Sequence, residues 1–454
     1  MPTLELLHWN DVHGRFAGLA RLSARAREIR AAAPHPVLLL DGGDVEDTSV
    51  RLSAMTFGVA GWRLLGAAGV DAAVAGNGGL LRYGPGLLPR YAAALGAPPL
   101  VCDLEDRDGE TPAGAAPSVL LPAGDLRVGV IGVTDYYGQY DGFGLAERGR
   151  MTAVRREADA LRRRGADVVV LLSHTGLNHD RGLSWALRGK VDVIVGGHTH
   201  HLLHDGDRSE GLPIAQAGCH AEHLGRVLLE VDAAGARVVS MSLEPVPAEA
   251  PADPAVLAEL AACEADLDAW MAEPVGHLPE PAAWSDSADS PAARLVAAAL
   301  HHHQPADLAV LIGGHLTAGL PAGPVTRHDV WTATSSPGNV ATGTLSGAEI
   351  RTMFLRGLSE EFATTKPRSF RGRPRGYLHF VGAHVEDEAI FVAGKPLEDD
   401  RRYRVTGSDL ELSPYGTLLD DEPDDLEVHV PAILPELLES YLASGRVRRQ
   451  RRPG

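Results

Sequence analysis

Five short apolar runs in the first half of the chain each end in side chains that can bind metal ions. The runs and the residues after them are LELLHW before Asp11 and His13, PVLLL before Asp44, VDAAVAG before Asn77, VVVLLS before His174, and VDVIVGG before His198 and His200. Such runs, bounded by glycines, predict buried strands of a parallel sheet. Because open α/β sheets bind ligands at the carboxyl ends of their strands, we expect the seven side chains to converge.

The seven side chains offer carboxylate, amide and imidazole groups and no thiolate, which suits manganese, zinc or iron. Seven donors are enough for two divalent metal ions that share one bridging carboxylate. Two ions about 3.5–4 Å apart can hold the attacking and leaving oxygens of a phosphoryl displacement and activate water at neutral pH. Each motif alone is typical of a strand end or a glycine turn, so the prediction rests on their ordered recurrence.

These motifs resemble those of the calcineurin-like metallophosphoesterases, and within them the 5′-nucleotidase family. LHWNDVHGR, LLLDGGD, AGNGG, LLSHTGLNHD and IVGGHTH look like five successive motifs of that family. The resemblance implies an α/β fold, with an N-terminal four-layer αββα metallophosphoesterase domain and a second, α+β domain of the 5′-nucleotidase C-terminal type. It also implies two sets of metal ligands that share Asp44. The first set is Asp11, His13, Asp44 and His200, and the second is Asp44, Asn77, His174 and His198.

The third motif departs from the family pattern. In the family the asparagine is followed by a histidine and an acidic residue, and an aspartate follows shortly after; the histidine and aspartate stabilise the transition state and help the leaving group. Here Gly78 and Gly79 follow Asn77. General acid catalysis typically contributes about 10²–10⁴-fold, so a centre without it would favour esters with good leaving groups. By motif position, the candidates for a replacement are Arg15, Arg82 and His179, each of which could equally be a structural or solvated side chain.

At 454 residues the chain exceeds the usual size of one hydrophobic core, which predicts two domains. We expect the metallophosphoesterase domain at 1–243, a helical linker at 244–289 with a helix from Pro254 to Met271, the substrate domain at 290–441 and a basic tail at 442–454. In the first domain, the stretch from Thr48 to Ala68 reads as one largely buried helix.

The second domain resembles the family in segments such as SSPGNVATGTLSGAEIRTMFLRGL, but its substrate-binding features are altered. The asparagine-rich turn with its arginine is replaced by the sequence Ile312 to Leu316, IGGHL. The aromatic pair that encloses a nucleobase in the family has no clear counterpart. Tyr377, Phe380 and Tyr415 are the nearest aromatic residues and are our candidates for substrate contacts.

The composition limits the partners and the location. A net charge of −18 argues against a nucleic-acid-binding protein, which needs a basic face. Three cysteines without CxxC spacing, Cys102, Cys219 and Cys263, predict free thiols. The first strand begins without a signal sequence, and no apolar stretch approaches the roughly 20 residues that span a membrane. We therefore expect a cytoplasmic protein with a small-molecule phosphate ester as its partner, no nucleic acid and no membrane.

Three functions stay open at this point. The first is a metal-dependent hydrolase of a nucleotide or a related small phosphate monoester. The second keeps the bimetal centre but cleaves a different ester, such as a cyclic phosphodiester or a thiosulfate-type ester, which needs less protonation of the leaving group. The third is a non-catalytic protein that binds metal and anion. Retention of all seven metal-binding side chains favours an enzyme over the third.

Overall fold

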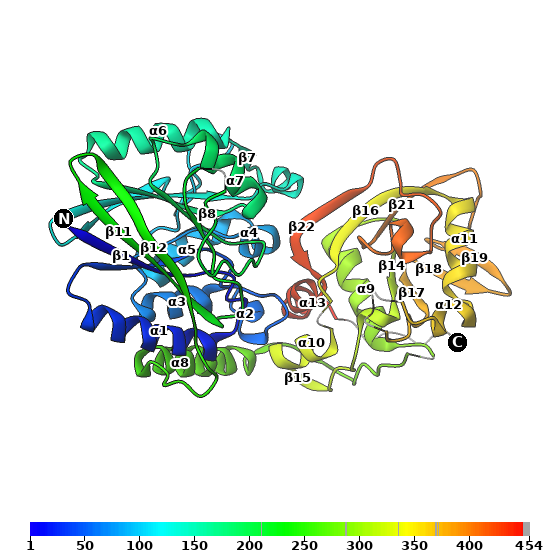
Figure 1. The fold of residues 1–454 in the computed structure, drawn as a ribbon. Helices are drawn as coiled ribbons and strands as arrows, with labels where there is room; N and C mark the ends of the chain where they lie inside the picture. Colours follow the sequence, from blue (N-terminus) through cyan, green and yellow to red (C-terminus); the bar gives the residue numbers. More distant parts are fainter. Residues whose placement is uncertain (210, 287, 335, 368–369, 371, 448–454) are drawn as a thin grey trace. The chain divides into compact units, whose positions relative to one another are not determined.

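The computed structural model forms two compact units, residues 1–267 and residues 268–454. It describes the whole chain except residues 210, 287, 335, 368–369, 371 and 448–454 (Figure 1). The predicted presence of two domains is therefore confirmed. Each unit has its own sheets and its own hydrophobic core.

The first unit contains two five-stranded sheets that pack face to face. The first sheet has the order β12-β11-β1-β2-β3, and the second has the order β10-β9-β8-β6-β5. The strands of the first sheet are β1 (Thr3–Trp9), β2 (Val37–Asp41), β3 (Ala72–Ala73), β11 (His223–Asp232) and β12 (Gly235–Pro245). Those of the second are β5 (Ser118–Ala123), β6 (Leu126–Thr134), β8 (Val168–His174), β9 (Val193–Gly196) and β10 (Ile214–Ala215). Outside these sheets, β4 (Leu104–Glu105) pairs with β7 (Ala146–Glu147).

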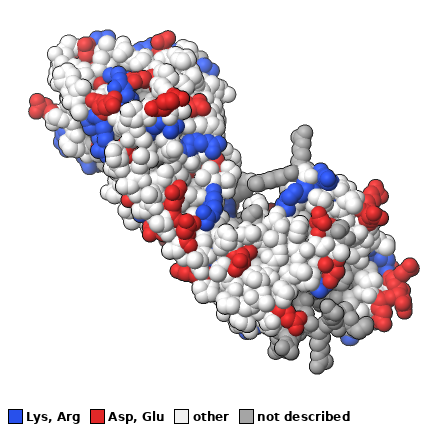
Figure 2. Space-filling view, turned by 90° about the horizontal axis from the view of Figure 1, so that it is seen from below, with Lys and Arg blue, Asp and Glu red and all other residues white. Residues whose placement is uncertain are grey.

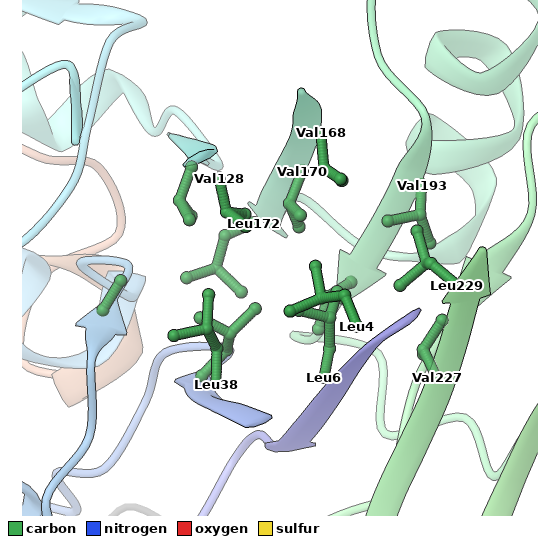
Figure 3. Close-up of a cluster of buried hydrophobic side chains, with 14 of the residues drawn as sticks. Leu4, Leu6, Leu38, Val128, Val168, Val170, Leu172, Val193, Val227 and Leu229 are labelled. Atoms are coloured by element: carbon green, nitrogen blue, oxygen red, sulfur yellow. The ribbon is translucent and has the colours of Figure 1, made fainter. Parts of the chain in front are cut away.

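A layer of aliphatic side chains fills the space between the two sheets (Figure 3). Alternate residues of each strand point to this layer, since successive side chains lie on opposite faces. Leu4 and Leu6 of β1 belong to it, together with Val170 and Leu172 of β8, and all four are completely buried. The same alternation directs Leu7 of β1 and Leu171 of β8 to the outer faces, where both are buried as well.

Helices cover both outer faces, which completes the predicted four-layer αββα arrangement (Figure 1). Helices α1 (Phe16–Ala32) and α3 (Val59–Ala68) lie on the first sheet, and α6 (Arg150–Arg163) and α7 (Leu177–Ala186) on the second. The other helices that precede β11 in this unit are α2 (Arg51–Met55), α4 (Asn77–Tyr83), η1 (Pro85–Leu87), α5 (Leu88–Leu95) and η2 (Gly138–Phe143).

The prediction of a single helix from Thr48 to Ala68 is wrong. The chain forms α2 and α3 there, separated at Phe57 and Gly58, whose φ angles of 55° and 81° are left-handed. A right-handed helix cannot continue through two such residues, and the apolar spacing on either side gives no sign of the break.

Parallel pairing brings the ends of the predicted strands together. In the first sheet β1, β2 and β3 are parallel, and in the second β6, β8 and β9 are parallel. The seven predicted metal-binding residues lie at or just after the carboxyl ends of β1, β2, β3, β8 and β9, as expected for ligand-binding positions of α/β sheets.

The second unit is built on one mixed sheet of order β17-β14-β21-β16-β22, in which only β14 and β21 are parallel neighbours. Its strands are β14 (Leu308–Ile312), β16 (Asn339–Ser346), β17 (Leu378–Val381), β21 (Arg402–Ser408) and β22 (Glu427–Ile433). Helices α9 (Pro291–His303) and α13 (Leu434–Ala443) pack on one face, and α11 (Gly347–Gly357) and α12 (Glu360–Thr364) on the other. Ser290 caps α9 by accepting a hydrogen bond from the backbone N–H of Ala293. This α+β architecture agrees with the prediction.

Smaller elements complete the second unit. They are η3 (Gly313–His315), α10 (Arg327–Ala333), η5 (Pro414–Gly416) and a three-stranded sheet of β18 (Ala383–Glu386), β19 (Ala389–Val392) and β20 (Lys395–Pro396).

The segment expected as a linker is partly built into both units. Its first two residues end β12, and helix α8 (Pro254–Met271) forms as predicted. Strand β13 (Pro274–Leu278) then pairs with β15 (Gly323–Thr326), so this part of residues 244–289 belongs to the second unit. Of the expected basic tail, residues 448–454 lie outside the described residues.

The charged side chains on the surface and the free cysteines are those of an ordinary globular protein. Acidic and basic side chains are intermixed on the face shown in Figure 2. All three cysteines are free, as predicted. Among the described helices, none combines the length and apolar character needed to cross a bilayer. The cytoplasmic location stays a prediction.

Candidate metal centre

Three of the seven predicted metal-binding side chains form one group, with Asp11 and His13 after β1 and His200 after β9. The Oδ1 atom of Asp11 lies 3.4 Å from Nε2 of His200 and 3.6 Å from Nε2 of His13, and the two Nε2 atoms are 3.1 Å apart. Asp11 is completely buried, yet its Oδ1 atom has no hydrogen-bond partner among the described residues. A buried oxygen without a partner is costly, so this group fits a bound cation.

The other four residues form a second group. Nε2 of His174 lies 3.3 Å from Oδ2 of Asp44 and 3.1 Å from Oδ1 of Asn77. Nδ1 of His198 lies 2.9 Å from the same Asn77 oxygen. Asn77 is the first residue of α4, which follows β3, and His174 is the last residue of β8. The four donors therefore come from both sheets.

Asp11 joins the two groups. One ligand atom each from Asp11, His13 and His200 lie within 4.8 Å of one another, and so do atoms from Asp11, Asp44 and His174. Asp44 stays the predicted bridging carboxylate, and Asp11 also lies close to ligand atoms of both groups. Either carboxylate would connect two ions, and carboxylate, amide and imidazole donors suit the predicted manganese, zinc or iron.

The backbone at the predicted ligands is unusual. Five of the seven have a left-handed conformation, with φ angles of 51° at Asp11, 46° at His13, 54° at Asp44, 73° at His198 and 57° at His200. Positive φ values occur in only a few per cent of non-glycine residues. Such conformations persist where the surrounding structure enforces them, and they cluster at functional sites.

Polar neighbours fix the orientation of the buried ligands. Nδ1–H of His174 donates to the carbonyl oxygen of Gly42 at 2.7 Å, which leaves Nε2 directed at Asp44 and Asn77. The Oδ2 atom of Asp11 accepts hydrogen bonds from the side chain of Asn10 at 2.7 Å and from the backbone N–H of His198 at 2.8 Å. Hydrogen bonds to those atoms of a ligand side chain that do not face the metal are typical of metal sites.

The carboxylates and imidazoles of the site shift each other's pKa values. Burial tends to raise the pKa of Asp11, but the imidazoles of His13 and His200 hold this pKa below its usual range. Burial likewise tends to lower the pKa of His174, but the Asp44 carboxylate raises it to about 10. Burial also tends to raise the pKa of Asp44, but His174 and the backbone N–H of Gly78 together lower it. A cluster of carboxylates held in the ionised form is suited to receive cations.

The position of the missing catalytic histidine lies at the edge of the second group. The backbone N–H of Gly78 donates a 2.8 Å hydrogen bond to Oδ1 of Asp44. A Cβ atom at Gly78 would lie 3.1 Å from the same oxygen, and one at Gly79 would lie 2.9 Å from Oε1 of Glu46. The space that these glycines leave is therefore narrow.

The three candidates for the missing acid lie in different places. Arg15 is exposed and immediately precedes α1, two residues after His13. Arg82 stacks on the ring of Tyr83 at 5.0 Å. The His179 side chain is 61% exposed on α7, and its Nδ1 atom lies 3.9 Å from a carboxylate oxygen of Asp135.

Asp135 was missed by the sequence reasoning. Its other oxygen lies 3.7 Å from Nε2 of His198, so it connects His179 to the second group. Asp135 directly follows β6, and the pattern that identified the other ligands could have identified it. Tyr137, one of three tyrosines after that strand, places its hydroxyl 3.5 Å from Nε2 of His198.

His220 was missed as well, and no motif indicates it. Its ring centroid lies 5.9 Å from that of His13 and 6.0 Å from that of His200. Its backbone N–H donates a 2.7 Å hydrogen bond to the carbonyl oxygen of Asp11. No predicted strand precedes it, and a left-handed turn with φ values of 60° at His220 and 58° at Ala221 sets its position.

The aromatic candidates of the second unit have different surroundings. Phe380 is in β17, and its ring centroid lies 4.6 Å from that of Phe354 in a hydrophobic core. Tyr377 is partly buried, and its carbonyl oxygen accepts a hydrogen bond from Gly313. Tyr415 is 85% exposed. Packing accounts for Phe380, whereas Tyr377 and Tyr415 stay predictions.

The turn that replaces the family's asparagine-rich segment contains a buried histidine. Nδ1 of His315 lies 2.7 Å from the hydroxyl of Ser336, and Nε2 lies 3.0 Å from Oε1 of Glu411. Glu411 also accepts hydrogen bonds from the backbone N–H groups of Ile312 and Ser408. This network stabilises the loops at the end of β14.

Two family models match the chain. Residues 4–202 match the model described as calcineurin-like phosphoesterase, and residues 274–414 match the one described as 5′-nucleotidase, C-terminal domain. The uncharacterized metallophosphoesterase YunD of Bacillus subtilis is 27% identical, with 97% of this chain and 99% of YunD aligned. The 5′-nucleotidase of Bos taurus is 26% identical, and the alignment spans 60% of this chain and about half of the bovine protein, 54%.

Solved structures share the fold over both units. The 5′-nucleotidase precursor of Thermus thermophilus has a TM-score of 0.53 at 20% identity, covering 97% of this chain and 96% of that one. The NAD nucleotidase of Haemophilus influenzae has a TM-score of 0.57 at 16% identity, with 97% and 96% covered. Calcineurin-like phosphoesterases use divalent metals. The chain belongs to the calcineurin-like phosphoesterases, it carries a 5′-nucleotidase C-terminal domain after the phosphoesterase domain, and it is a hydrolase of that family.

Proposed function

We propose that the protein hydrolyses a nucleotide or a related small phosphate monoester at a binuclear metal centre formed by Asp11, His13, Asp44, Asn77, His174, His198 and His200. The observation that supports this most directly is the proximity of donors from five separate chain segments, with Asp11 close to ligand atoms of both groups. When bound, two divalent ions polarise phosphoryl oxygens and make water a nucleophile near neutral pH.

The protein's own residues have three tasks in this proposal. Asn10 and the backbone N–H of His198 hold the Asp11 carboxylate in place, so that its other oxygen stays directed at His13 and His200. The Gly42 carbonyl oxygen accepts a hydrogen bond from Nδ1–H of His174, so Nε2 is the ring nitrogen directed at the metal site. The buried position of Asp44 and His174 excludes water from one side of the centre, which strengthens the electrostatic interactions there.

The glycine at position 78 limits which esters react quickly. No imidazole can protonate the leaving oxygen from this position, so esters with acidic leaving groups are the better substrates. Asp135 lies beside His198 of the second group, and His179, whose Nδ1 atom lies 3.0 Å from the carbonyl oxygen of Thr175, lies 3.9 Å from Asp135. We propose His179 ahead of Arg82 as the partial replacement, because Asp135 connects His179 to His198.

A second candidate function is also supported by Gly78. A thiosulfate-type ester releases a thiolate, which needs less protonation than an alkoxide, and the same seven ligands would suffice for it or for a cyclic phosphodiester. The two functions differ in substrate and share the metal centre.

The test is to assay the purified chain loaded with manganese, zinc or iron for phosphate release from nucleoside monophosphates and from 4-nitrophenyl phosphate. A cyclic phosphodiester and thiosulfate serve as the alternative substrates. The proposal expects turnover of phosphate monoesters, faster with the activated ester, and loss of turnover in Asp44→Ala. Turnover that survives this substitution would refute metal catalysis. Metal binding without turnover of any ester would favour a binding protein.

A further inference from the structure

A cavity of about 750 Å³ lies beside the first group of metal-binding residues, within the N-terminal unit. Gly14, next to His13, lines it, and so does His220, whose ring lies about 6 Å from those of His13 and His200. The other walls are the first turn of α1, residues of α2 and the loop before it, and side chains of α8. The volume is typical of small-ligand sites, which range over about 300–1,000 Å³.

Two arginines of this cavity have no carboxylate partner in the part of the chain that the structure describes. Arg15 and Arg21 both line it, and within the described residues neither forms an ion pair. The Nε atom of Arg21 is buried, and no described residue offers it an acceptor. The next three arginines of α1 differ, because Arg25 pairs with Glu244, Arg27 with Asp253 and Arg30 with Asp71.

An anion would satisfy these groups. A guanidinium presents five N–H donors in a planar arrangement that matches carboxylate and phosphate oxygens. Leaving a buried donor such as Nε of Arg21 without an acceptor is unfavourable. The first three residues of α1, a helix of 17 residues, also line the cavity, and the N-terminal end of a helix carries partial positive charge.

Two glutamates line the same cavity and limit the charge that it can accept. Glu222 and Glu264 belong to its walls, yet neither forms an ion pair with Arg15 or Arg21 within the described residues. Their presence disfavours more than one anionic group inside this cavity. The cavity therefore fits one anionic group bound at the arginines and an apolar segment along Val50, Leu52 and Leu260.

We propose that this cavity binds the non-reacting end of the substrate, and that the substrate carries a second anionic group, a carboxylate or a second phosphate, held by Arg21 and Arg15. The inference rests on the proposed function, because it places the reacting phosphate at the neighbouring metal centre. It adds that substrates are selected by a second charge.

The experiment compares phenyl phosphates whose para arm of one, two or three carbons ends in a carboxylate, a phosphonate, a carboxamide or an amine. Catalytic efficiency, kcat/KM, is measured for each with the manganese-loaded full chain. Binding of the matching non-hydrolysable phenylphosphonates is measured by calorimetry. With an arm of suitable length, the anionic compounds should have a kcat/KM and a binding affinity roughly tenfold higher than the carboxamide. This is the size expected for a partly exposed charge-assisted hydrogen bond. The preferred anion, carboxylate or phosphonate, identifies the kind of second group.

Arg21→Met should reduce the ratio of anionic to carboxamide substrate towards one. The matched control is Arg155→Met, an exposed arginine on α6, which should keep the wild-type ratio. Equal binding of the anionic and carboxamide phosphonates at every arm length, or a preference for the amine, would overturn the inference. A binding preference that disappears in Arg21→Met supports it even if no ester is hydrolysed, and that result would refute only the proposed hydrolase.

Discussion

Nε2 of His174 lies 3.3 Å from a carboxylate oxygen of Asp44, and the two residues come from different sheets of the first unit. The contact joins the carboxyl ends of β2 and β8, and it anchors the second group of donors. His13 and His200 form the corresponding contact of the first group. The two groups can therefore be tested separately.

Removing one ligand from each group should remove one ion at a time. Wild-type protein dialysed against manganese should retain close to two ions per chain, and both His174→Ala and His13→Ala should retain close to one, because each variant leaves the other group intact. The measurement is metal content by mass spectrometry, with circular dichroism as a check on folding. His204→Ala, at an exposed position on the loop after β9, is the control. Loss of both ions in either variant would argue for one shared site.

Introducing the missing histidine should change the dependence on the leaving group. In Gly78→His, phosphate release from nucleoside monophosphates should rise relative to release from 4-nitrophenyl phosphate, by up to about 10²-fold if general acid catalysis is restored. The new Cβ atom would lie 3.1 Å from Oδ1 of Asp44, so this carboxylate must move slightly. Gly78→Ala carries the same steric change without the imidazole. An equal effect of both substitutions on the two substrates would show that position 78 supplies no acid.

Much of this site could be predicted because the strands are parallel. An apolar run followed by Asp44 or His174 specifies both the strand and the side of the sheet at which the polar residue emerges. Asp135 obeys the same rule after β6, so it was predictable in principle. His220 was not, because a turn with two left-handed residues sets its position and periodicity does not encode such a turn. The break between α2 and α3 at Phe57 escaped for the same reason.

The role of Phe380 shows a different limit of sequence reasoning. An aromatic residue in a loosely matched strand can bind a substrate or fill a core, and only its neighbours distinguish the two. Its contact with Phe354, within a cluster that includes Val310 and Ile350, indicates the core. Phe380 was a candidate only as one of the aromatic residues nearest the expected substrate region, and that position does not give the direction of its side chain.

Truncating Phe380 should therefore destabilise the second unit. Phe380→Ala should lower the free energy of unfolding of this unit by about 2–3 kcal/mol, somewhat less than for a fully buried phenylalanine. Tyr415→Ala, at an 85% exposed position, should change it by less than about 0.5 kcal/mol. Hydrogen exchange of peptides from β14 and β17 in urea reports on this unit alone. Unchanged exchange in Phe380→Ala together with a raised KM would return Phe380 to the substrate site.

His8 should make the first unit sensitive to acid. The side chain is completely buried in β1 opposite Gly225, and neither ring nitrogen has a hydrogen-bond partner among the described residues. Burial lowers the pKa of His8 to about 4, whereas the unfolded chain has a histidine pKa of about 6.5. Between these values the unfolded chain binds more protons, so the contribution of His8 to stability is complete above about pH 6.5 and is lost as the pH falls to 4.

The substitution His8→Leu should remove this dependence. As the pH falls from 7 to 4, the free energy of unfolding of the variant should rise by about 3 kcal/mol relative to that of wild type. A difference of 2.5 pKa units corresponds to roughly that amount. At pH 7 the two should be similar, because leucine removes an unpaired polar ring while leaving some space. Leu4→Ala, in the same strand, should lower stability equally at both pH values, because it removes no titrating group. Hydrogen exchange of β1 and β11 peptides in urea gives the measurement, and a constant difference between His8→Leu and wild type at pH 7 and pH 4 would contradict the argument.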